Sequence, residues 1–296
     1  KIYMQYLKFL FLGVFYMKLK HLKIPVFISL VLLAVMFILQ TAGKLNGIFG
    51  NSDFMCNAVC FFSILFLAVV IIVMGYCVKW PKDFSFTVKK NVITSIFSLL
   101  AGVFLGAESI TKLLNYINGY RNIMQLVLSL FGIASGIVFV MIGICYFIGK
   151  NIFKNREILV LIPVVWSIIR LFERFSVYSS VSRYPWEMLD EIVIIFVTLF
   201  LLNLARVFAN VDNAGKLRGL FVFGYLSVIF IVFETVFLSK TNTTNTLDLQ
   251  YFTNTVNYFL AIFIIALLEN LSKALQKSGN DKVKVLAEKP DDEVAE

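Results

Sequence analysis

The sequence predicts an all-α integral membrane protein, a polytopic bundle of about eight transmembrane helices preceded by an interfacial helix. Composition gives the first reason, because 59% of the residues are hydrophobic and only 15% are charged. Soluble domains are about 45–50% apolar and about 25% charged. The second reason is that apolar runs of ~20 residues, long enough to cross ~30 Å of hydrocarbon, recur along the chain. The lipid bilayer is therefore the expected partner of most of the outer surface.

The chain divides into three predicted parts. Residues 1–21 carry lysines throughout and are expected to form an amphipathic helix at the membrane interface. Residues 22–276 form one transmembrane domain, and its apolar segments approach the ~20 residues that a span requires. The segments run roughly over residues 22–41, 57–78, 91–113, 123–148, 158–176, 190–209, 217–238 and 252–271. Residues 277–296 turn polar and are expected to form a disordered cytoplasmic tail.

The third observation is the distribution of positive charge, which sets the predicted orientation. Most of the 27 Lys and Arg residues lie in the two terminal arms and in the links after the second, fourth and sixth spans. The alternate links hold far fewer, so both termini are predicted to be cytoplasmic, in a cell membrane. The net charge of +9 follows this topology. We therefore expect no nucleic acid as a partner.

Several kinds of site are excluded or disfavoured by residue type. His21 is the single histidine, so zinc sites of the HExxH kind and histidine-based catalytic triads lack their essential residues. The four cysteines lie in or beside apolar runs, where small packing residues are common. No catalytic set, metal site or cofactor is predicted, and an enzymatic activity is not favoured.

Ionisable residues within the spans mark the candidate site. Such side chains are costly when they face lipid, so they normally face the bundle interior or water. With the predicted orientation and a rise of ~1.5 Å per residue, seven of them fall in the outer third of the bundle. They are Glu108, Arg170, Glu173, Arg174, Asp190, Glu191 and Glu234.

Two interpretations of these seven residues stay open. In the first, Arg170 and Arg174 bind an anionic group in an outward-facing cavity, and Glu108 or Glu234 takes up a proton. In the second, the charges form interhelical ion pairs that hold the bundle together, since acids outnumber arginines in the spans. Arg170 is the most informative residue under either interpretation because it lies deepest, where burial of a charge costs most.

Weaker features concern packing and the inner side. Small-xxx-small steps at Gly102 and Gly106, and at Gly132 and Gly136, predict helix surfaces that approach closely, and a homodimer contact stays open. Glutamates near the outer ends of the third and seventh spans are compatible with two repeated four-span halves. On the inner side, a surface salt bridge is expected between Glu269 and the lysine four residues later.

Three functions are carried forward. The leading hypothesis is a transporter or permease-like protein with an extracytoplasmic polar cavity for a small, anionic or amphiphilic solute. The alternative is a non-transporting receptor, assembly factor or subunit of a membrane complex, because only Pro163 interrupts the interior of a span, whereas many transporters use broken helices. The third is an intramembrane lipid-modifying enzyme, although no nucleophile–base set is visible.

Overall fold

The computed structural model describes residues 53–78, 80, 86–118, 123–178, 188–210, 215–237 and 247–287. The regular elements in these ranges are helical: α3 (Asp53–Cys77), α4 (Val92–Ile117), α5 (Ile123–Ile148), the short 3₁₀ helices η2 (Ile152–Asn155) and η3 (Glu157–Leu161), α6 (Ile162–Tyr178), α7 (Leu189–Phe208), α8 (Gly215–Phe237) and α9 (Leu247–Ala287). The predicted interfacial helix and the first predicted span lie outside the described residues.

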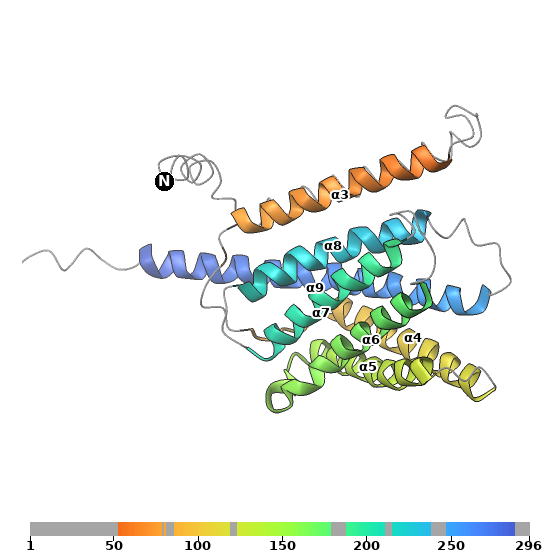
Figure 1. Ribbon diagram of the computed structural model, residues 1–296. Helices are drawn as coiled ribbons and strands as arrows, with labels where there is room; N and C mark the ends of the chain where they lie inside the picture. The colour runs from red at the N-terminus through yellow and green to blue at the C-terminus, as the bar shows by residue number, and fades with distance from the viewer. Residues whose placement is uncertain are drawn as a thin grey trace, which may run out of the picture.

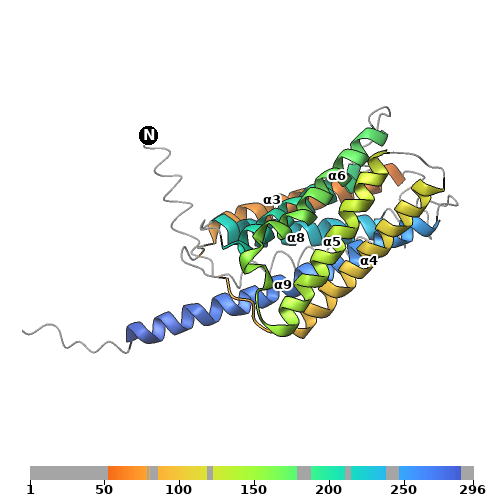
Figure 2. The same ribbon diagram turned by 90° about the horizontal axis from the view of Figure 1, so that it is seen from below.

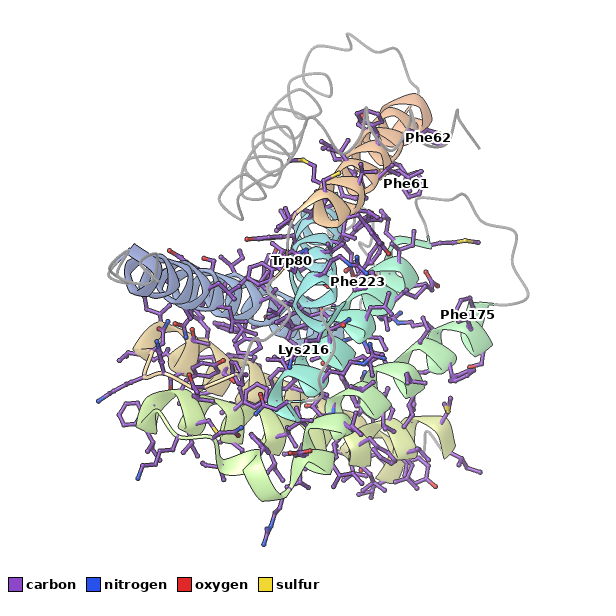
Figure 3. The ribbon with its side chains drawn as sticks, turned by 90° about the vertical axis from the view of Figure 1, so that its left-hand side faces the viewer. Phe61, Phe62, Trp80, Phe175, Lys216 and Phe223 are labelled. Atoms are coloured by element: carbon purple, nitrogen blue, oxygen red, sulfur yellow. The ribbon has the colours of Figure 1, made fainter. Side chains whose placement is uncertain are left out.

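Helices α4 to α9 form a closed ring. Each helix from α4 to α8 contacts the next one along the chain, and α9 closes the ring by packing against α4. Figure 3 views this ring from one end, with α6 and α9 on opposite sides of it. Helix α3 lies outside the ring and packs against α8 (Figure 1). The ring therefore has an interior that is lined by protein and shielded from lipid.

The chain is an integral membrane protein. Five helical stretches among the described residues are long and apolar enough to cross a membrane, namely Val92–Ile117, Ile123–Ile148, Leu189–Phe208, Gly215–Glu234 and Thr255–Leu275. The apolar part of α3, Phe61–Cys77, is shorter. Helix α6 has only 17 residues, three of them charged. The predicted all-helical membrane class is thus confirmed, whereas the number of eight spans stays a prediction.

Close backbone approach joins α4 to α5 along the predicted glycine steps. A Cβ atom added at Gly102 would lie 2.7 Å from the carbonyl oxygen of Gly136, so no larger residue fits without movement. Two serine hydroxyls use this proximity. Ser98 Oγ donates to the carbonyl oxygen of Phe139 at 2.7 Å, and Ser95 Oγ donates to that of Gly143 at 2.7 Å. The glycine faces therefore serve packing within one chain.

Aromatic pairs fill the remaining contacts of the ring. Phe104 of α4 stacks on Phe259 of α9 with ring centroids 4.8 Å apart, and Phe196 of α7 stacks on Phe230 of α8 at 5.0 Å. Lipid tails are as apolar as these side chains, so removal from water cannot drive helix association in a membrane. Complementary packing of the rings supplies the contact energy instead.

Helix α9 extends into the predicted tail, of which residues 288–296 lie outside the described residues. Helix α9 has 41 residues and runs without interruption to Ala287, whereas disorder was expected from residue 277. Figure 2 shows its C-terminal part projecting past the rest of the bundle. The composition of this stretch predicts disorder for a free segment. Here the stretch continues a helix that is already formed, and propagation of a helix costs far less than its nucleation.

Side-chain caps order the end of the bundle where α4 begins and α7 ends. Asn91 Oδ1 caps α4 by accepting from the backbone N–H groups of Ile93 and Thr94. Asn210 follows α7 with a positive φ of 50°, a conformation that Asn adopts more readily than most residues. Its Oδ1 accepts from the backbone N–H of Phe86 at 3.0 Å, which fixes the preceding link against the end of α7.

Candidate functional site

Three of the seven candidate residues meet at one end of the ring, and a fourth lies beside them. Arg174 Nη1 of α6 is 3.6 Å from Asp190 Oδ2 of α7. The Glu234 carboxyl of α8 lies within hydrogen-bonding reach of Asp190, and both Arg170 and Arg174 are close enough to attract it. We call Asp190 and Glu234 the carboxyl pair. Consecutive helices thus contribute the two arginines, Asp190 and Glu234 in turn.

Local sequence and helix register explain this meeting. Asp190 lies in the first turn of α7, where unpaired backbone N–H groups and the helix dipole favour an acidic side chain. About two turns deeper, Ser167 Oγ of α6 and Thr198 Oγ1 of α7 share a hydrogen bond of 2.8 Å. That bond fixes how far the antiparallel helices slide past each other. In this register Arg174 is opposite Asp190.

The carboxyl pair has a specific protonation chemistry. Two ionised carboxylates have no hydrogen to share, so a hydrogen bond between Asp190 and Glu234 requires that one of them carries a proton. Glu234 is only 7% exposed, and its Oε2 has no hydrogen-bond donor among the described residues. Two like charges so close together, one of them buried, favour a single shared proton. The pair can therefore hold and release one proton.

Arg170 occupies a different environment, deeper in the ring. Its side chain is 7% exposed, and its guanidinium carbon lies 5.4 Å from the centre of the Trp166 ring. Within the part of the chain that the structure describes, the guanidinium makes no hydrogen bond and no ion pair. Among the described residues, the Trp166 ring and the Glu234 carboxyl attract the Arg170 guanidinium.

A small cavity adjoins Arg170 inside the ring. Its volume of about 10 Å³ is about the space that one water molecule needs. Three helices, α6, α7 and α9, line it through Trp166, Ser167, Arg170, Val193, Ile194, Val197, Asn257 and Leu260. Asn257 of α9 is 4% exposed, and no hydrogen bond engages its amide among the described residues. Two buried polar groups from helices on opposite sides of the ring thus share one cavity.

The other predicted residues lie apart from this arrangement or beside it. Glu108 is buried, and its Oε1 is 2.9 Å from Lys112 Nζ, one turn further along α4. Glu191 is buried next to Asp190 on α7. Glu173 is half-buried, and its carboxylate makes no ion pair with a described residue. Of the predicted residues, the structure thus brings Arg174, Asp190 and Glu234 together, and Glu173 makes no ion pair with them.

Two buried polar residues were missed or misplaced at the level of sequence. Asn257 was not singled out, although an Asn within an apolar helix is itself a signal of an inward-facing position. Lys216 was counted among the loop cations that set topology, yet it lies in the first turn of α8 and is only 4% exposed. Position along the chain cannot reveal such burial, because the residues that cover Lys216 come from the folded bundle.

The predicted surface salt bridge at Glu269 is present in the structure. Lys273 Nζ lies 3.0 Å from Glu269 Oε1, and both side chains are largely exposed, so this is a surface salt bridge. Arg206 is exposed near the end of α7. Among the described residues, no group of three or more His, Cys, Asp or Glu side chains is placed to hold a metal ion.

Comparison with protein-family models, with curated proteins and with solved structures finds no match to this chain. A functional assignment must therefore start from the carboxyl pair, the arginines of α6 and the cavity beside Arg170.

Proposed function

We propose that this membrane protein is a proton-linked transporter of a small solute, and that the carboxyl pair is its proton-binding site. The single observation that carries the proposal is the meeting of Glu234 and Asp190 at one end of the helix ring, with two arginines facing Glu234. Ionisable groups that are kept within a membrane bundle at high energetic cost commonly mark a path for ions or protons.

The net charge of the arginines and the carboxyl pair depends on whether the pair holds its proton. The four groups that face one another, two arginines and two carboxyls, carry two positive charges against one negative charge when the pair is protonated. Loss of the proton balances the charges. Coulombic interactions are several-fold stronger in such a poorly solvated interior than in water. The proton state therefore decides how strongly the ring attracts an anion, which is the coupling that a symporter needs.

The cavity beside Arg170 is too small for a solute in this conformation. The cavity beside Arg170 is water-sized, so a larger molecule enters only when the surrounding helices separate. The link between Arg174 and Asp190 is a reasonable place for that separation. Its atoms are 3.6 Å apart, and the two side chains are 28% and 30% exposed. Water reaches both side chains in part and screens their attraction, so separating this pair costs less than separating a fully buried one.

A second candidate function is a non-transporting subunit in which the cluster is structural. The ion pair between α6 and α7 and the small size of the cavity favour it. Under this alternative the carboxyl pair serves only to hold α7 against α8. The third interpretation, an intramembrane lipid-modifying enzyme, gains no support from the described side chains.

Reconstituted vesicles with a pH-sensitive dye inside can test the proposal. External pyruvate, phosphate, glycine and glucose would be added in turn to vesicles that contain the wild-type protein, Glu234→Gln or Glu269→Gln. Pyruvate is almost fully ionised at neutral pH and leaks slowly across lipid. We expect solute-driven acidification with the wild type, none with Glu234→Gln, and wild-type behaviour with Glu269→Gln, whose carboxylate is exposed.

Two outcomes would count against transport. Unchanged proton movement in Glu234→Gln would show that the carboxyl pair is not the proton site. If no solute of the panel acidifies wild-type vesicles and Glu234→Gln is much less thermally stable, the structural alternative would be favoured. Thermal unfolding of each variant in detergent therefore accompanies the flux measurement.

A further inference from the structure

The buried Arg170 guanidinium has no ion-pair or hydrogen-bond partner among the described residues. A guanidinium has five N–H donors and carries its charge at any accessible pH. Buried in a membrane bundle, such a group normally pairs with a carboxylate or donates to carbonyl oxygens. Among the described residues Arg170 does neither, and it adjoins a cavity instead.

The nearby acids leave Arg170 without a direct partner. Asp190 is paired with Arg174 and lies against Glu234. Glu234 attracts Arg170, yet no ion pair within 4.0 Å joins them. The carboxyl pair therefore satisfies Arg174 first, and the positive charge of Arg170 points to an additional anion.

We infer that Arg170 and Asn257 form the binding subsite for the carboxylate group of a small monocarboxylate. The inference rests on the proposed function for its role in transport, while the binding itself can be measured without flux. The subsite lies in the cavity between α6, α7 and α9, about one turn deeper than the meeting of Arg174 with Asp190.

The donors fit a planar carboxylate. An arginine fork donates two parallel hydrogen bonds to the two oxygens of a carboxylate, and an Asn amide supplies a further donor. The Trp166 ring lies against the guanidinium, which limits its orientations before a ligand arrives. A carboxylate oxygen can take the water-sized space, whereas a tetrahedral phosphate needs a wider opening.

The walls of the cavity indicate what the carboxylate is attached to. Apart from the polar groups, the lining consists of Val193, Ile194, Val197 and Leu260. Such walls leave a hydroxylated or charged tail without partners, and unpaired polar groups are penalised in an apolar place. The expected ligand is therefore a monocarboxylate with a short, mainly apolar substituent.

The carboxyl pair should tune this subsite. Arg170 and Arg174 from α6 and Asp190 from α7 face Glu234, and Glu191 is buried next to Asp190. A proton on the carboxyl pair removes one negative charge from the neighbourhood of Arg170. Anion binding should therefore tighten as the pair takes up its proton, and by linkage the bound anion favours the protonated pair.

Binding of pyruvate to the purified full-length protein in detergent tests the inference. Isothermal titration at pH 6 and at pH 8 would compare the wild type with Arg170→Lys, Asn257→Leu and Arg206→Gln. Arg170→Lys keeps the charge and loses the fork. Asn257→Leu keeps the volume and removes the amide without changing any charge. Arg206→Gln removes an exposed arginine from the inner end of α7 and serves as the control.

We expect Arg170→Lys to weaken pyruvate binding at least about tenfold, equivalent to about 1.4 kcal/mol, and Asn257→Leu to weaken it severalfold. Arg206→Gln should bind as the wild type does, and inorganic phosphate should bind the wild type more weakly than pyruvate. If Arg170→Lys fails to fold, Asn257→Leu alone decides the question. Wild-type affinity in the folded Asn257→Leu variant, or no binding of pyruvate to the wild type, would overturn the subsite.

The flux assay separates this inference from the proposed function. Pyruvate binding that depends on Arg170 and Asn257 without proton-linked flux would leave the subsite intact and remove transport. Proton-linked flux that survives both Arg170→Lys and Asn257→Leu would leave transport intact and remove the subsite.

Discussion

Replacement of Gly102 by alanine should strain the seam between α4 and α5, whereas the same change at Gly106 should be tolerated. The two glycines lie one turn apart on α4, so they form a matched pair. A Cβ atom at Gly102 would lie 2.7 Å from the carbonyl oxygen of Gly136 and 2.9 Å from the backbone nitrogen of Val140. A Cβ atom at Gly106 would meet nothing within 4 Å.

The magnitude follows from what must move. Backbone atoms of α5 cannot rotate away as a side chain can, so the helices must part by several tenths of an ångström. Parting also stretches the 2.7 Å bonds that Ser95 and Ser98 make across the seam. Overpacking by one methyl group typically costs about 1–3 kcal/mol. The gain in helix propensity from Gly to Ala is common to both variants and cancels in their difference.

Thermal unfolding in one detergent, followed by circular dichroism, provides the assay. A difference of about 1–3 kcal/mol corresponds to roughly 2–12 °C in Tm for a domain of this size. Gly102→Ala should therefore unfold at a clearly lower temperature than Gly106→Ala. Equal Tm values for the two variants, or the reverse order, would refute the close approach of α4 and α5.

Two further pairs of variants test other contacts by the same unfolding measurement. Asn210→Gly and Asn210→Ala both lose the hydrogen bond to the Phe86 N–H, but only alanine is strained at a φ of 50°. Asn210→Ala should therefore be the less stable variant by about 1 kcal/mol. The reverse order of stability would contradict this. Glu108→Gln removes the carboxylate that pairs with the largely buried Lys112 and should lower the free energy of unfolding by about 1–3 kcal/mol. Glu269→Gln breaks an exposed pair and should lower it by less than about 1 kcal/mol. Equal losses of stability would show that the Lys112 ammonium reaches water.

Element positions could be predicted well because hydrophobic periodicity and span length act locally. The predicted segment 123–148 coincides with α5, and 190–209 is displaced by one residue from α7. The C-terminal end of α9 could not be predicted in this way. Its polar residues match a free disordered tail in composition, whereas in the structure they continue the preceding helix to Ala287.

The candidate site was predictable in its members more than in its contacts. Hydropathy and orientation selected Arg174, Asp190 and Glu234 because charged residues in a membrane must face inward. The same logic could not separate them from Glu173, which adjoins Arg174 in the sequence and makes no ion pair with a described residue. The selection of charged residues within spans could not identify Asn257, because its side chain is neutral.

The sequence by itself determined that this protein is helical, that it is embedded in lipid, and which charged residues cannot face that lipid. These properties depend on side-chain type and on spacing along one helix. Only the tertiary structure decided that α9 closes a ring against α4, that Glu234 meets Asp190, and that Arg170 shares a cavity with Asn257. Such pairings join residues that are distant in the sequence, and their energies depend on distance and burial, which exist only after the helices have packed.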